Sequence, residues 1–430
     1  MAGVKAFRAL RYTAKAGALA DLIAPPYDII GAEERRRLAA RGPYSHVHLS
    51  LPEGEDEGGL LESRYQHARG ILSQWLANGI VAVEDAPSLT VVRERFRVGG
   101  EERVRTGVHV ALRLDRYGEG DVYPHEWTLE GPRTDRLRLM RATKANLSPV
   151  FALVPDKAGE LRAWFAETTA REPDQNIQGP DEAARSVWIE RAPERAARLE
   201  RACEGVPAVI ADGHHRYETG LAYRDELAAA GRDPAEAVRI LCHVVAIEDP
   251  GLVVLPTHRV VTPHGRIEPA RFLEDLRARF DLAPADREDA AEFARSVAAR
   301  GAPQEFIVAV GRPLRVFRAR LRDPAEMARR APDRATAWRT LDVPCLHLLV
   351  MQDVLGISPE AVAGGGLVSY TRDAGTTLAA AEGEGGVGFV LRATPPQAVL
   401  EVARSGEKMP QKSTYFFPKV AAGIAMRLIG

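Results

Sequence analysis

The stretch VPAVIADGHHR at residues 206–216 decides the fold at the centre of this 430-residue chain. Its first six residues form an apolar run with the length of a buried strand, and helical composition begins near Tyr217. Between them lie Asp212, a glycine, two histidines and Arg216. The pattern predicts a strand, a tight turn and a helix, and the first turn of such a helix presents unpaired backbone N–H groups.

The turn expected at residues 212–216 is suited to binding an anion. Gly213 would let the backbone approach a phosphate closely, and Arg216 can grip a phosphate with two parallel hydrogen bonds. His214 and His215 are expected to donate hydrogen bonds to oxygens that gain charge during a transfer reaction. Asp212 is the candidate ligand for Mg²⁺ or acceptor of a proton. The alternative is a capped turn in which Asp212 satisfies backbone donors.

The overall composition excludes several classes of protein. The 58 Lys and Arg residues nearly balance 59 Asp and Glu, giving a formal net charge of -1, which argues against a dedicated nucleic-acid binder. A hydrophobic content of 45% excludes global disorder, and three cysteines are too few for a disulfide framework. The sequence shows no signal-peptide pattern and no run near the ~20 apolar residues of a membrane span. We therefore expect a cytoplasmic globular protein without a membrane partner.

A second group of candidate residues lies between residues 121 and 149. Residues 131–144 carry five basic side chains against one aspartate, a local excess of four positive charges. Glu126 precedes this segment and is the candidate general base for a hydroxyl nucleophile, with His125 or Thr128 orienting it. The basic side chains expected to contact phosphate are Arg133, Arg136 and Lys144. A surface helix laced with salt bridges is the alternative interpretation.

Lysine is rare in this chain, because only seven of the 58 basic residues are lysines. Three of the seven fall in KMPQKSTYFFPK at residues 408–419, where Lys412, Ser413 and Thr414 are expected to reach a phosphate. An exposed edge segment fits the same residues equally well.

Arg259 is expected to supply another anion contact. The GEGGVG stretch at 383–388 runs from a helical pattern into a strand pattern, so it is not a dinucleotide fingerprint.

The succession of short strand and helix patterns indicates a mixed α/β or α+β protein. We expect an N-terminal α/β lobe at 1–100, a catalytic core at 101–262 and a C-terminal α/β lobe at 263–430. Within them, residues 182–204 are expected to form one charged helix and residues 398–403 a strand.

Six motifs together resemble those of a bacterial and archaeal family that was long catalogued only as a domain of unknown function. They are APPYD (24–28), HEWT (125–128), DRLRLMRATKANLSP (135–149), DGHHR (212–216), LPTHR (255–259) and MPQKSTYFFPK (409–419). The central portion of the family resembles the ParB/sulfiredoxin-type fold. The family is also similar to kinases that phosphorylate free serine with inorganic pyrophosphate.

The resemblance implies that the chain converts free L-serine to O-phospho-L-serine in serine and cysteine metabolism, with pyrophosphate as donor and Mg²⁺ as cofactor. It places Asp212, Gly213, His214, His215 and Arg216 on the phosphate-binding turn. Catalytic roles fall to Glu126, His125, Asp212 and His214, and substrate contacts to Thr128 and Asn146. Arg133 departs from the lysine that relatives often carry.

Three alternatives stay open beside the pyrophosphate-dependent kinase. The first is a serine kinase that uses ATP or ADP, since the donor is not fixed by the residues. The second is a phosphohydrolase that uses water as nucleophile at the same anion-binding turn. The third is a ParB-like nucleotide-binding regulator without catalysis. The expected partners are small molecules, namely L-serine and pyrophosphate or a nucleotide, without nucleic acid; the oligomeric state is open.

Overall fold

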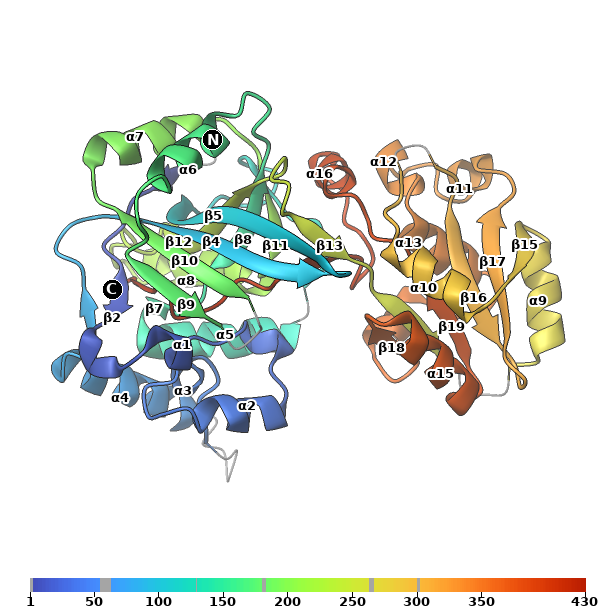
Figure 1. The fold of residues 1–430 in the computed structure, drawn as a ribbon, viewed down its shortest axis with the longest axis horizontal. Helices are drawn as coiled ribbons and strands as arrows, with labels where there is room; N and C mark the ends of the chain where they lie inside the picture. Colours follow the sequence, from blue (N-terminus) through green and yellow to red (C-terminus); the bar gives the residue numbers. More distant parts are fainter. Residues whose placement is uncertain (1–2, 55–62, 129, 180–182, 263–266, 300–301) are drawn as a thin grey trace. The chain divides into compact units, whose positions relative to one another are not determined.

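The computed structural model describes residues 3–54, 63–128, 130–179, 183–262, 267–299 and 302–430. The chain folds into two compact units (Figure 1). Unit 1 consists of Met1–Pro124, Thr128–Leu252 and Pro418–Gly430, and unit 2 of His125–Trp127 and Val253–Phe417. Residue 100, where a lobe boundary was expected, lies in a hairpin that joins two strands of the unit 1 sheet.

Unit 1 is built on a mixed sheet to which nine strands of the described residues contribute, in the order β6-β11-β8-β12-β5-β4-β10-β9 with β1 beside β5. Its strands are β1 (Val4–Lys5), β4 (Leu89–Val98), β5 (Glu101–Arg113), β6 (Val122–Tyr123), β8 (Val150–Val154), β9 (Gln175–Gln178), β10 (Ala184–Glu190), β11 (Ala208–Asp212) and β12 (Arg239–Ala246). Strand β11 pairs with β6 on one side and β8 on the other. Its apolar residues are therefore buried, as the sequence predicted.

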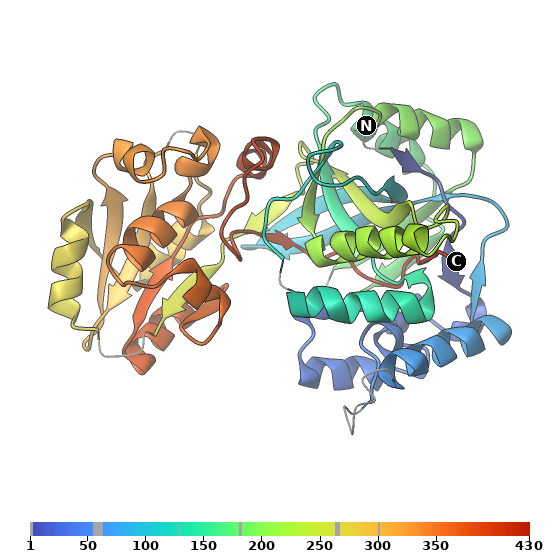
Figure 2. The same cartoon turned by 180° about the vertical axis from the view of Figure 1, so that it is seen from behind.

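Helices pack on this sheet and on one another. They are α1 (Leu19–Leu22), α2 (Ala32–Ala39), α3 (Val47–Ser50), α4 (Ser63–Ala77), α5 (Glu130–Thr143), α6 (Glu160–Thr168), α7 (Pro193–Ala202) and α8 (His214–Ala229). Helix α5 lies between α8 and α4 and contacts both, and Figures 1 and 2 show α5 and α8 running side by side. Two short pairs complete unit 1: β2 (Leu10–Tyr12) with β3 (Val81–Val83), and β7 (Ala145–Asn146) with β21 (Arg427–Leu428). The pair β7–β21 fixes the C-terminal segment next to the end of α5.

Unit 2 is built on a second sheet, to which six strands of the described residues contribute in the order β15-β17-β16-β19-β14-β18. These strands are β14 (His258–Val261), β15 (Phe280–Ala285), β16 (Glu305–Val310), β17 (Arg315–Leu321), β18 (Val368–Thr371) and β19 (Val387–Val390). A separate ribbon pairs β13 (Val253–Leu255) with β20 (Tyr415–Phe417).

The helices of unit 2 are α9 (Pro269–Arg277), α10 (Arg287–Arg295), α11 (Ala325–Arg330), α12 (Thr336–Arg339), α13 (Asp342–Cys345), α14 (Pro359–Ala363), α15 (Ala374–Glu384) and α16 (Pro396–Arg404), with a π-helical segment at Leu346–Gln352. Phe293 of α10 and Leu378 of α15 pack on Ile307 and Val390 of the sheet to form a core. No helix of the described residues is long and apolar enough to cross a bilayer.

The structure confirms the mixed α/β class, and two local predictions are wrong. The segment 182–204 is not one helix, because β10 pairs with β4 and β9 before Pro193 opens α7 at its first position. The segment 398–403 is helical rather than extended, since Val399 and Val402 are buried three residues apart on one face of α16. The likeness of the core to the ParB/sulfiredoxin-type fold stays a prediction.

Candidate functional site

The strand, turn and helix expected at DGHHR lie in unit 1. Strand β11 ends at Asp212 and α8 begins at His214, with Gly213 between them in the left-handed region at φ 88°. A Cβ atom at residue 213 would lie 2.8 Å from Cζ and Nε of Arg216. Glycine is therefore required both by the backbone conformation and by the space that Arg216 takes. The guanidinium group folds back over the turn at the N-terminus of α8.

Two cations hold Asp212. Its Oδ1 accepts a hydrogen bond from Nζ of Lys419, and its Oδ2 accepts one from Nη2 of Arg216 at 2.6 Å. Burial alone would raise the pKa of Asp212, but the charges of Lys419 and Arg216 outweigh burial and hold this pKa well below its ordinary value. A carboxyl group with so low a pKa is a weak proton acceptor. The geometry therefore favours a positioning role for Asp212, which orients both cations.

The turn carries a net positive charge. One carboxylate faces two cations, and the side chains of Lys419 and Arg216 are only 10% and 8% exposed. The N-terminus of α8 adds the positive end of a helix dipole. Among the described residues, the buried Nε of Arg216 has no hydrogen-bond partner. His214 is buried and His215 is partly buried in the first turn of α8. This arrangement is suited to an anion.

The same turn does not fit a protein-held magnesium ion. Within the described part of the chain, no group of three or more His, Cys, Asp or Glu side chains is placed to hold a metal ion. Both oxygens of Asp212 already accept from cationic side chains, and Mg²⁺ requires oxygen ligands in a near-octahedral set. The positive charge at the turn therefore comes from Lys419 and Arg216, and the metal role of Asp212 stays a prediction that this geometry does not support.

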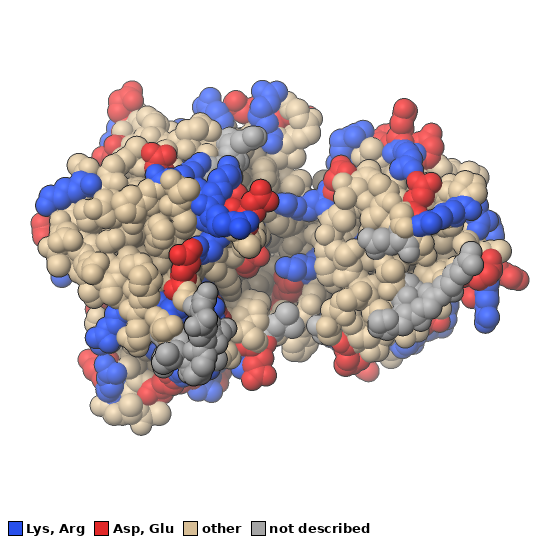
Figure 3. Space-filling model, turned by 90° about the horizontal axis from the view of Figure 1, so that it is seen from below, with Lys and Arg blue, Asp and Glu red and all other residues tan. Residues whose placement is uncertain are grey.

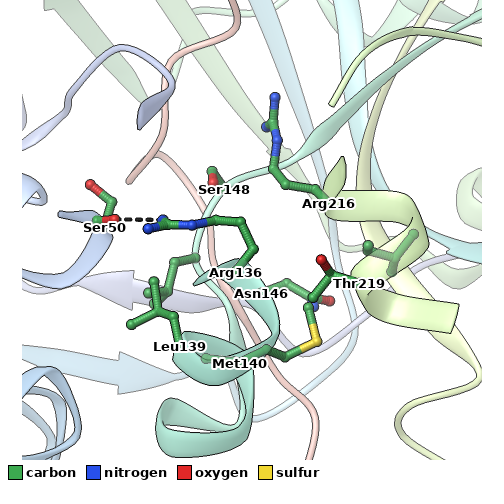
Figure 4. Close-up of a pocket in the computed structure, with 11 residues that line it drawn as sticks. Ser50, Arg136, Leu139, Met140, Asn146, Ser148, Arg216 and Thr219 are labelled. Atoms are coloured by element: carbon green, nitrogen blue, oxygen red, sulfur yellow. Dashed lines mark hydrogen bonds between the residues drawn. The ribbon is translucent and has the colours of Figure 1, made fainter. Parts of the chain in front are cut away.

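A small, partly open hollow of about 40 Å³ adjoins the turn, and Arg216 forms part of its wall (Figure 4). Arg136 and Asn146, both expected to be site residues, line the same hollow. Asn146 is buried, and its Oδ1 accepts the backbone N–H of Leu241 at 3.0 Å. Hydroxyl-bearing and apolar side chains complete the wall, among them Ser148, Thr219, Leu139, Met140 and Ile240.

Three other expected residues of unit 1 lie outside this hollow. Thr128 donates its hydroxyl hydrogen to Oε2 of Glu218 on α8 at 2.7 Å, and Arg133 lies 3.9 Å from the same carboxylate. Glu218 is one turn beyond His214, so Thr128 and the exposed Arg133 lie beside the first turns of α8. Lys144 is exposed at the opposite end of α5, where its backbone N–H bonds to the carbonyl of Met140.

Unit 2 gathers expected site residues from distant segments of the chain. Oε1 of Glu126 accepts the backbone N–H of Lys412 at 2.8 Å, and Nε2 of His125 lies 2.9 Å from the hydroxyl oxygen of Thr414. The backbone of residues 125–127 runs parallel to the chain at Met409. Glu126 is therefore fixed by a backbone amide, while the hydroxyl of Thr128, which was expected to orient it, bonds to another carboxylate.

Arg259 holds the same loop from its other side. It is fully buried on β14, and its Nη2 donates to the carbonyl oxygens of Gln411 at 3.3 Å and Lys412 at 3.0 Å. Burial lowers the pKa of Arg259 to about 10. Ser413 is buried and donates its hydroxyl hydrogen to the carbonyl of Pro410, whereas the side chain of Lys412 is exposed. Arg259 and Ser413 thus shape the loop, and their expected phosphate contacts stay predictions.

Lys419 is the site residue that sequence reasoning missed. It is one of only seven lysines and ends the motif at 409–419, so its residue type was a usable signal. Its contact with Asp212 spans 207 residues and depends on the C-terminal segment folding into unit 1. No local pattern of sequence reports such a contact.

Comparison with known proteins places the chain in a family. A family model described as "Protein of unknown function (DUF1015)" matches residues 4–344. The chain belongs to the DUF1015 family. The family resemblance seen in the sequence motifs is confirmed, and Lys419 lies beyond the matched residues. No curated protein matches the chain.

Several solved structures are similar to this DUF1015 chain at a low level. A conserved hypothetical protein from Pyrococcus furiosus shares 15% identity with a TM-score of 0.34, covering 75% of this chain and 95% of its own. A mutant free serine kinase in complex with ADP shares 13% identity with a TM-score of 0.35, covering 72% and 87%. SbnI with a C-terminal truncation, from Staphylococcus aureus, shares 11% identity with a TM-score of 0.35, covering 74% and 87%. We therefore base the function on the residues and contacts of the chain itself.

Proposed function

We propose that this DUF1015 protein is a phosphotransferase that moves one phosphoryl group from inorganic pyrophosphate to the hydroxyl group of free L-serine. The observation that carries the proposal is the pair of cations, Arg216 and Lys419, that Asp212 holds at the N-terminus of α8. A helix N-terminus with two cations of low exposure and one carboxylate favours a multiply charged anion such as pyrophosphate. The choice of serine rests on the motif resemblance.

The reaction forms a bond between the serine hydroxyl oxygen and phosphorus and breaks the bridge between the two phosphorus atoms. Orthophosphate leaves, and the hydroxyl proton passes to a carboxylate. In this proposal Arg216, Lys419 and the histidines of the turn stabilise the charge that spreads over the phosphoryl oxygens. Because phosphoryl transfer depends mainly on positioning and charge, cations fixed by Asp212 suit it.

Glu126 is the proposed proton acceptor. One of its oxygens accepts the amide of Lys412, and its other oxygen makes no hydrogen bond among the described residues. A carboxylate held in this way keeps one oxygen for a hydroxyl proton. We propose Mg²⁺ as the counter-ion that accompanies the donor, with no step assigned to it.

The charge distribution supports an enzyme rather than a DNA-binding regulator. On the face of the molecule in Figure 3, basic and acidic side chains are interspersed rather than gathered in one basic stripe. The formal net charge of the chain is -1. A protein that binds duplex DNA through its phosphates would favour a basic face and a steep dependence on salt.

The test is ³¹P NMR of the purified protein with Mg²⁺ and L-serine, supplied in separate tubes with pyrophosphate, ATP or ADP. We expect a phosphoserine signal with pyrophosphate, its loss in Arg216→Met, and its retention in the control Arg232→Met, which changes an exposed residue just beyond α8. A signal with ATP or ADP alone would change the donor. Orthophosphate formed equally without serine would identify a phosphohydrolase, and unchanged spectra in every tube would contradict the proposal.

A further inference from the structure

Arg136 of α5 is held more firmly than its neighbours on the same helix. Its Nε donates to Oδ2 of Asp135 at 2.7 Å, its Nη2 donates to the same oxygen, and its Nη1 donates to the carbonyl of Ser50 at 2.6 Å. The guanidinium carbon lies 4.1 Å from the ring centroid of Tyr27, within cation–π distance. A flexible side chain is thereby fixed on three sides.

A further set of contacts supports Asp135. Its Oδ1 accepts the hydroxyl hydrogen of Tyr65 at 2.7 Å and an N–H of Arg64 at 2.9 Å. Burial would raise the pKa of Asp135, but Arg136 and the hydroxyl of Tyr65 outweigh it and lower the pKa. The carboxylate is therefore ionised, and it faces two cations, so this cluster also carries a net positive charge.

Arg136 lines the hollow of Figure 4, where its guanidinium group points toward Ser50. A guanidinium has five N–H donors, and within the described residues the three hydrogen bonds of Arg136 use three of them. The two that are left are one each on Nη1 and Nη2. Ser148 and Thr219 add hydroxyl groups to the same wall, and no carboxylate side chain of the described residues lines it. The hollow therefore presents donors and positive charge, which suit a small oxyanion.

We propose that this hollow binds the carboxylate group of a small amino-acid acceptor, with Arg136 as the residue that grips it; this inference rests on the proposed phosphotransfer to an amino acid. The N–H donors left on Nη1 and Nη2 can pair with the two oxygens of a carboxylate. The phosphate groups of the donor have two further cations at the turn, Arg216 and Lys419 beside Asp212, and Arg216 also lines the hollow. This role for Arg136 also accounts for Tyr27 of the APPYD motif, whose ring packs against the guanidinium group. The proposed phosphate chemistry assigns no function to Tyr27.

The experiment compares L-serine with ethanolamine, which carries the same hydroxyl and amine without the carboxylate. Loss of a charge-assisted hydrogen-bond pair in Arg136→Met should lower kcat/KM for L-serine about 10- to 100-fold. The same variant should leave kcat/KM for ethanolamine within about twofold, because that acceptor has no group to lose. Arg136→Lys should recover only part of the activity, since lysine lacks the planar fork. Arg141→Met is the matched control, because Arg141 lies on α5 in an exposed ion pair with Glu226.

Calorimetric titration measures binding without turnover, so it tests this inference separately from the proposed function. It also gives a result if ethanolamine is not a substrate. We expect L-serine and 3-hydroxypropionate to bind the wild type and not Arg136→Met, while pyrophosphate binds both with equal affinity, which also verifies that the variant is folded. Serine binding that survives Arg136→Met, absence of carboxylate binding to the wild type, or a selective loss of pyrophosphate would overturn the inference. Arg136-dependent serine binding without phosphoryl transfer would instead overturn the proposed function alone.

Discussion

Asp212 in unit 1 and Glu126 in unit 2 are both carboxylates with expected catalytic roles, yet their surroundings differ. Asp212 has a side chain that is 11% exposed, and it accepts hydrogen bonds from two cationic side chains, Lys419 and Arg216. Glu126 accepts one hydrogen bond, from the backbone amide of Lys412, and its second oxygen makes none among the described residues. Cations depress the proton affinity of a carboxylate, whereas a single amide leaves one oxygen for a proton. The comparison favours a positioning role for the first carboxylate and supports the proposal that the second accepts a proton.

The largest effect is expected at Glu126. Removing a general base costs about 10²–10⁴ in rate, so Glu126→Gln should lower turnover by that factor while keeping the amide contact through its side-chain oxygen. Affinity for pyrophosphate should change little, because the cations of the turn are untouched. Stopped assays of phosphoserine formation and calorimetric titration with pyrophosphate measure the two quantities.

The control for this variant is Glu292→Gln, which changes an exposed carboxylate on α10 of unit 2. Equal turnover of Glu126→Gln and the control would remove Glu126 from the mechanism. If Glu126→Gln also loses affinity for pyrophosphate, Glu126 contributes to donor binding, and the two carboxylates do not have separate roles.

The next effect is expected at Lys419. Lys419→Met removes one of two cations from Asp212, and loss of a charge-assisted contact should raise the dissociation constant of pyrophosphate about 10- to 100-fold. Lys419→Arg should recover most of the affinity, because the charge returns. Calorimetry at fixed ionic strength measures both. Lys5→Met is the control, since Lys5 also pairs with a carboxylate of unit 1 but is 54% exposed. Unchanged affinity in Lys419→Met would leave Lys419 a structural tether of the C-terminal segment.

The two carboxylates also differ in how much of their surroundings could be predicted from sequence. The turn around Asp212 is local: an apolar run, Gly213 and a helical pattern within a few residues specify β11, the turn and α8. The partners are not local, because Lys419 is 207 residues from Asp212 and Lys412 is 286 residues from Glu126. Sequence therefore indicated which residue types bear the chemistry, while tertiary packing decided which of them meet.

Residue type and tertiary packing both explain the local errors. The stretch at 182–204 is rich in charged residues and alanine, which favour a helix, but Val187, Trp188 and Ile189 favour a strand, and Ala184–Glu190 pairs with β4 and β9 in the sheet of unit 1. Arg259 has the charge of a phosphate ligand, yet burial on β14 turns it toward the carbonyls of the 411–412 loop. The first outcome follows from residue types that favour a strand, and the second from the buried environment of Arg259.

A smaller effect is expected at Gly213. Gly213→Ala forces a side chain into the left-handed region and within 2.8 Å of Arg216, so we expect a loss of about 1–3 kcal/mol in the free energy of unfolding. The displaced guanidinium should also weaken pyrophosphate binding about tenfold, the effect of about 1.4 kcal/mol. Gly231→Ala is the matched control, because Gly231 has φ 66° and no atom lies within 4 Å of the place that a Cβ would take. The control should lose stability and keep full affinity; equal loss of affinity in both would trace the effect to the backbone alone.

The last effect concerns pH and is expected at β14 of unit 2. Burial lowers the pKa of His258 on β14 to about 4, and its Nδ1 accepts the backbone N–H of Leu391 at 3.2 Å only while unprotonated. Because the unfolded chain binds this proton near its ordinary pKa of 6.5, stability is full above that pH and falls as the pH drops from 6.5 toward 4. The slope for one group is at most about 1.4 kcal/mol per pH unit. Asp212, with its lowered pKa, keeps its ion pairs throughout this window.

Hydrogen exchange at pH 7 and pH 5, corrected for the intrinsic rate, checks this effect at β14. Amides of β14 and β19 should lose protection at pH 5, since β14 carries His258 and pairs with β19. His258→Gln keeps a neutral side chain at both pH values and should reduce this loss, although burial also lowers the pKa of His347 in unit 2. A loss of protection that is unchanged in His258→Gln would show that another buried group, and not His258, carries the effect.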